Sequence, residues 1–66
     1  MRTVAKMREL AQVLCKKGAD QEVIEAVISV LETDKNFERM IKEMNNLKNP
    51  SRECMIGKAI LIAEPD

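Results

Sequence analysis

Apolar residues recur along this chain every three or four positions, a spacing that is typical of amphipathic helices. Residues that cap or break helices interrupt the pattern in three segments, at residues 18–20, 33–34 and 48–51. The pattern predicts helices over residues 3–17, 21–32, 35–47 and 51–63. The fold class that we expect is therefore all-α: a single domain over residues 1–66, built as a small compact bundle of four short helices joined by tight loops.

The residues at the expected helix ends support these boundaries. Gly18 is suited to the left-handed conformation that ends a helix, and the carboxylate of Asp20 can accept the first amide hydrogens of the next helix. Pro50 keeps the residue before it out of the helical region and so closes the third helix. Residues 60–62, Ile-Leu-Ile, have strand character, but the sequence offers no second strand to pair with them, so we expect a helix there too. No internal sequence repeat is evident.

The length of the chain leaves a thin margin of stability. At 66 residues a folded chain removes only about 60% of its unfolded surface from water, and small domains are commonly supplemented by disulfides, a metal or oligomerisation. The two cysteines, Cys15 and Cys54, allow at most one bridge, and without histidine they cannot complete a zinc site. We therefore expect free thiols, no metal and no cofactor, and self-association as the remaining supplement.

Charge and aromatic content restrict the possible ligands. Eleven basic residues balance eleven acidic ones, so there is no global attraction to nucleic acid or to anionic lipid. Phe37 is the only aromatic residue, which leaves no stacking platform for bases or cofactor rings. The first residues lack the apolar run of a signal peptide, and no stretch approaches the roughly 20 apolar residues of a membrane span. We expect a cytoplasmic protein with no membrane contact and no small-molecule substrate.

Catalysis is not expected of this chain. Without histidine it lacks the usual proton shuttle near neutral pH and every nucleophile arrangement that depends on one. Glu22 and Glu25 share a helix face, but that face is the only polar one its helix has, so a solvated surface explains them better than an acid–base pair does. We assign no catalytic residue.

One segment resembles the helix-turn-helix of bacterial repressors. The segment 8–12, Arg-Glu-Leu-Ala-Gln, is followed by Gly-Ala-Asp-Gln at residues 18–21 and then by Ile24 and Val27. The resemblance implies that the 21–32 helix enters the major groove, yet residues 20–34 contain five acidic side chains and no basic one. The 3–17 helix is basic instead, so the alternative prediction is a small DNA-binding regulator that uses its basic face.

A second alternative concerns the thiols. Cys15 lies beside Lys16 and Lys17, and nearby positive charge favours the reactive thiolate, although the negative end of the helix dipole opposes it. Cys54, near a helix start, is better placed electrostatically but has no resolving cysteine nearby in the sequence. This pattern leaves open a thiol-based redox sensor.

The width of the apolar arcs is the most informative functional signal. The 21–32 helix has an apolar arc of roughly 200°, and the 51–63 helix has two apolar faces, more than one neighbouring helix would cover. We expect a non-enzymatic protein-interaction module that acts through these faces, with a homodimer as the favoured form and the binding of a partner helix as the alternative. The expected interaction residues are Val13, Ile24, Ile28, Leu31, Cys54, Ile60 and Leu61. Met40, Met44 and Met55 could instead line an adaptable groove for a partner helix, although methionine more often simply fills a core.

Overall fold

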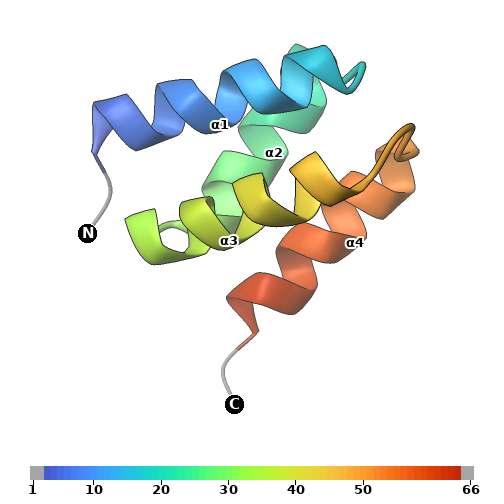
Figure 1. Cartoon of the computed structure of the whole chain (residues 1–66). Helices are drawn as coiled ribbons and strands as arrows, with labels where there is room; N and C mark the ends of the chain where they lie inside the picture. The colour runs from blue at the N-terminus through green and yellow to red at the C-terminus, as the bar shows by residue number, and fades with distance from the viewer. Residues whose placement is uncertain (1–2, 65–66) are drawn as a thin grey trace.

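A computed structural model describes residues 3–64 and shows an all-α fold, as the sequence predicts (Figure 1). Within that range the chain forms four helices and no strand. Their bounds are α1 Val4–Lys16, α2 Gln21–Leu31, α3 Asp34–Asn46 and α4 Arg52–Ala63. Residues 60–62 belong to α4, which confirms that their apolar run is helical and not extended.

Each helix begins after a serine, threonine or aspartate whose side chain accepts a hydrogen bond from the amide three residues further on. These N-caps are Thr3, Asp20, Thr33 and Ser51. They satisfy amide groups that would otherwise have no partner inside the helix, and loss of one such cap typically costs about 1 kcal/mol. Gly18, with a φ of 92°, follows the end of α1, in agreement with its predicted role as a left-handed stop.

The helices are arranged as two helical hairpins, α1–α2 and α3–α4, stacked side by side in the same orientation (Figure 1). At the helix N-termini, the Thr3 amide donates to Asp34 Oδ1 over 2.7 Å. At the C-terminal ends of the same two helices, Lys17 Nζ donates to the carbonyl oxygen of Leu47. Helices α1 and α3 therefore run parallel.

Helices α2 and α4 are parallel as well, because Arg52 at the start of α4 reaches the start of α2. Its guanidinium lies 3.1 Å from Glu22 Oε2 and 3.7 Å from Asp20 Oδ2. The most extensive helix contacts are α2 with α4 and α1 with α3, not those inside each hairpin. The main interface of the molecule is thus the one between the two hairpins.

This stacking is a structural repeat that the sequence does not reveal. Lys17 and Leu47, like Glu22 and Arg52, lie 30 residues apart and occupy neighbouring places in the two hairpins. At the same offset, Leu10 and Leu14 of α1 correspond to Met40 and Met44 of α3, and all of them are buried. The two hairpins show no matching residue pattern in the sequence, because side chains of different shape fill equivalent core positions.

The core lies between the two hairpins and takes residues from every helix. Its buried side chains are Leu10, Leu14, Ala19, Val23, Val27, Leu31, Phe37, Met40, Met44, Met55 and Ala59. No buried side-chain nitrogen or oxygen of the described residues lacks a hydrogen-bond partner. Met40, Met44 and Met55 are core residues with at most 2% of their surface exposed, which confirms the interpretation of these methionines as core filling over the alternative of a methionine-lined groove.

The two glycines should respond to alanine in opposite directions. Gly18 has a left-handed φ of 92°, so Gly18→Ala is expected to destabilise the fold by about 1 kcal/mol. Gly57 lies inside α4, where an added methyl group would meet no neighbouring side chain within 4 Å, so Gly57→Ala is expected to stabilise the fold by about 0.5–1 kcal/mol. Urea denaturation followed by circular dichroism measures both changes; shifts of the same sign would contradict the prediction.

Candidate functional site

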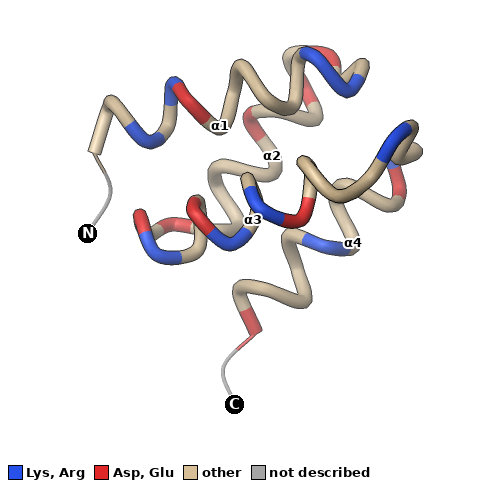
Figure 2. Tube along the Cα trace, in the orientation of Figure 1, with Lys and Arg blue, Asp and Glu red and all other residues tan. Residues whose placement is uncertain are grey.

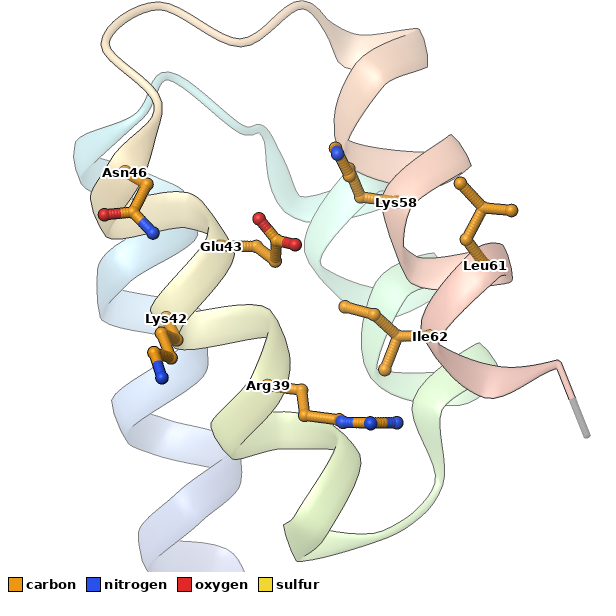
Figure 3. A pocket seen from close by; sticks show the side chains of 7 residues that line it. All are labelled: Arg39, Lys42, Glu43, Asn46, Lys58, Leu61 and Ile62. Atoms are coloured by element: carbon orange, nitrogen blue, oxygen red, sulfur yellow. The ribbon is translucent and has the colours of Figure 1, made fainter. Parts of the chain in front are cut away.

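A pocket lies between α3 and α4, on the side of the second hairpin that faces away from the first (Figure 3). Its volume is about 510 Å³. Its lining residues are Arg39, Lys42, Glu43 and Asn46 of α3 and Lys58, Leu61 and Ile62 of α4. Figure 3 shows Arg39 and Glu43 extending from α3 toward α4, and Ile62 extending from α4 toward α3.

The pocket is predominantly cationic. Arg39, Lys42 and Lys58 contribute three positive charges against the single negative charge of Glu43. Within residues 3–64, no carboxylate lies within 4.0 Å of the charged nitrogens of these three side chains. Basic segments of α3 and α4 are visible around this region in Figure 2. The pocket therefore presents positive charge that the described part of the fold does not neutralise by ion pairing.

An exposed apolar side chain borders this charge. Leu61 lines the pocket and is 64% exposed, although leucine is normally one of the more buried residue types. Ile60 is 50% exposed, and consecutive helix positions are about 100° apart around the axis, so it lies on another side of α4. Helix α4 thus exposes an apolar side chain on each of two sides. Of these two side chains, Leu61 lines the pocket together with basic residues.

The predicted interaction residues fall into three groups. Ile60 and Leu61 are exposed. Half-buried positions are occupied by Val13, Ile24, Ile28 and Cys54. The inclusion of Leu31 as a surface residue is wrong, because it is 1% exposed and belongs to the core, where it lies on the same stripe of α2 as Val23 and Val27. The broad apolar arc of α2 is explained largely by its packing on several neighbours.

The sequence pattern does not single out the charged residues of the pocket. Arg39, Lys42 and Glu43 lie on the polar side of α3, which by itself is typical of an ordinary solvated helix face. Only the packing of α3 against α4 places this side next to Lys58 and Leu61. No spacing in the sequence indicates that juxtaposition, because the two halves of the site are separated by the loop between α3 and α4 and by the first turns of α4.

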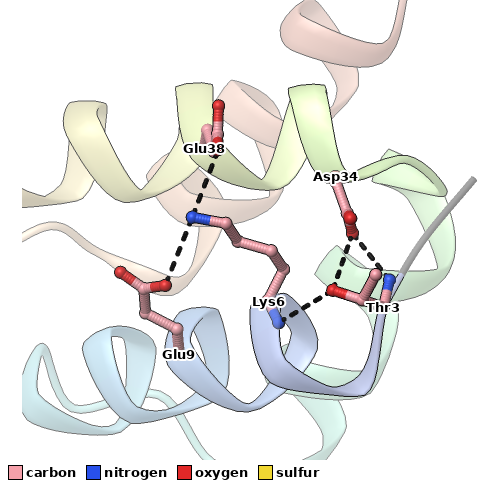
Figure 4. A network of polar contacts seen from close by, with 5 residues as sticks. All are labelled: Thr3, Lys6, Glu9, Asp34 and Glu38. Carbon is pink, nitrogen blue, oxygen red and sulfur yellow. Dashed lines mark hydrogen bonds and ion pairs between the residues drawn. The ribbon is translucent and has the colours of Figure 1, made fainter.

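The basic surface of α1 is partly occupied by contacts with α3 (Figure 4). Lys6 Nζ lies 3.2 Å from Glu38 Oε1 and 3.5 Å from Glu9 Oε2. The hydrogen bond to Glu38 raises the pKa of Lys6 above its ordinary value, while desolvation acts in the opposite direction. Stability from this pairing is present at neutral pH and is lost only as alkaline pH rises through the raised pKa.

The ion pairs between helices do not join the two helices of opposite charge. The basic residues of α1 and the acidic residues of α2 would allow these two helices to attract each other along their rims. The ion pairs between helices instead join α1 to α3 through Lys6 and join α2, with its cap, to Arg52 of α4. On α1, Arg8 and Lys16 are exposed, whereas α2 exposes Glu22 and Glu25. The helix placed in the major groove by the repressor resemblance therefore presents acidic side chains.

Other site chemistries have little geometric basis in the described chain. No three acidic or thiol side chains among residues 3–64 are grouped as a metal site. Cys15 is exposed and Cys54 is half-buried, and both are free thiols. None of the helices described is long and apolar enough to cross a membrane.

The comparisons with known proteins provide no relative from which to transfer a function. No family model matches the chain, and neither curated proteins nor solved structures give a match. A function for this chain can therefore be inferred only from its own geometry.

Proposed function

We propose that this chain is a small helical protein-interaction module and that its α3–α4 face is the binding surface. The observation that carries the proposal is Leu61, which is 64% exposed at the edge of a 510 Å³ pocket. Apolar side chains exposed beside a concave surface and surrounded by polar ones are typical of protein-binding sites. We expect the chain to act by covering part of another protein, without catalysis and without a cofactor.

The proposal is tested by affinity capture from the cell of origin with the whole chain as bait. Leu61→Glu introduces a charge at the edge of the pocket and is expected to weaken capture of specific partners at least about tenfold, as loss of an interface anchor does. Val4→Glu is the matched control, because Val4 is 67% exposed on the first hairpin. Both variants should keep the helical circular dichroism of the parent. Equal capture by all three proteins would contradict the proposal.

Self-association is the second candidate, and the exposure of Ile60 on another side of α4 favours it. A symmetric dimer would cover two copies of that side chain at once and add apolar burial to a small domain. Sedimentation velocity at micromolar concentration is expected to show a dimer that Ile60→Glu dissociates. A monomer at all accessible concentrations would contradict this candidate and leave the α3–α4 binding surface in place.

A further inference from the structure

The contacts between the two hairpins show how this fold holds stacked helices in register. The α1–α3 contact pairs Lys6 with Glu38 over 3.2 Å, and the α2–α4 contact pairs Arg52 with Glu22 over 3.1 Å. In both contacts a cation of one hairpin meets a carboxylate of the other beside the buried apolar core. Such exposed pairs contribute little energy but select the partner and its orientation.

The outer face of the second hairpin has the cations and apolar side chains of such a contact, but only one carboxylate. Arg39, Lys42 and Lys58 line the same pocket as the apolar Leu61 and Ile62, while only Glu43 provides negative charge there. A third hairpin stacked on this face would have to provide carboxylates that pair with these cations, as Glu38 pairs with Lys6 between the two existing hairpins. The face is therefore complementary to an acidic surface with an apolar stripe.

Two regular contacts with a second copy of the chain, one symmetric and one head-to-tail, would fit this face poorly. In a symmetric contact, the Arg39, Lys42 and Lys58 of one copy would face the same three side chains of the other, which charge repulsion opposes. In a head-to-tail contact that continues the stack, α1 of the next copy would pack on α3 of the first copy in the way that α3 packs on α1 within one chain. Arg8 of the next copy would then occupy the position equivalent to that of Glu38. This would bring a cation toward a pocket that is already cationic.

We propose that the α3–α4 face binds an acidic amphipathic helix of another protein, which lies along the groove between α3 and α4. Its apolar residues, spaced three or four positions apart, cover Leu61 and Ile62, and its carboxylates pair with Arg39, Lys42 and Lys58. The length of contact is set by α3 and α4, of 13 and 12 residues, so the partner needs about three to four helical turns. This inference rests on the proposed protein-binding function and specifies the chemistry of the partner.

The probe is a display library of helical peptides about 14 residues long, randomised at all positions and centred on zero net charge. Selection against the whole chain is expected to enrich peptides with a net charge of about −2 or lower and an apolar stripe. Fluorescence anisotropy then measures the Kd of the enriched peptides. Arg39→Glu combined with Lys58→Glu is expected to weaken binding at least about tenfold, and Arg8→Glu, on the other hairpin, to change it less than about twofold.

A charge-exchange experiment separates specific pairing from a general loss of fold. The Arg39→Glu/Lys58→Glu variant should bind a peptide whose glutamates are replaced by lysine more tightly than the parent chain does, which an unfolded variant would not. The inference would be overturned if the enriched peptides are not acidic but bind the Leu61→Glu variant more weakly than the parent chain. The proposed function would still stand in that case. If no enriched peptide loses binding in Leu61→Glu, both are contradicted.

Discussion

Phe37→Ala is expected to unfold most of the protein at 25 °C. The Phe37 side chain is completely buried and is the largest of the core residues. Truncation of a buried phenylalanine to alanine costs about 3–5 kcal/mol, because it removes apolar burial and leaves a cavity. A single core in a chain of this size rarely supplies more than about 3–5 kcal/mol, so one substitution consumes most of the stability.

Far-ultraviolet circular dichroism during urea titration is the appropriate measurement, since the chain has no tryptophan or tyrosine to report by fluorescence. The matched control is Ile60→Ala, which truncates a side chain that is 50% exposed and is expected to change the free energy of unfolding by less than about 1 kcal/mol. A loss below about 1.5 kcal/mol for Phe37→Ala would show that the stability of the core does not depend on this ring.

Ala59→Leu is expected to destabilise the protein by about 1–3 kcal/mol through overpacking. Ala59 is completely buried on the face of α4 that packs into the core, and α4 makes its most extensive contacts with α2. Three additional carbon atoms at this position would force the two hairpins apart or displace neighbouring side chains from their rotamers. The effect is notable because leucine is nearly as good a helix former as alanine and is the more apolar residue.

Ala5→Leu provides the control, because Ala5 lies on the exposed side of α1 and gains the same atoms without a packing conflict. Its free energy of unfolding is expected to change by less than about 0.5 kcal/mol. Thermal and urea denaturation of both variants measure the difference. Equal stability of the two variants would mean that the hairpins are not closely packed at Ala59.

The sequence by itself determined the local structure of this protein. Thr3, Asp20 and Ser51 cap helices through hydrogen bonds to amides three residues away, and Gly18 follows the first helix with a left-handed φ. These interactions join residues close together in the chain, as does the apolar periodicity that marks the buried side of each helix. The number of helices and their type could therefore be predicted, with ends that differ from the observed ones by a residue or so.

Only the tertiary structure decided how the helices stack and therefore what the surface offers. Each apolar stripe fits several arrangements of four helices, and the surface charge pairs that accompany one arrangement are worth too little to be inferred from composition. The stacking buries Leu31, which the sequence suggested as an interaction residue, and leaves Leu61 exposed beside Arg39 and Lys58. The candidate site joins residues from two helices across a loop, and packing between distant residues, which the local pattern does not encode, creates it.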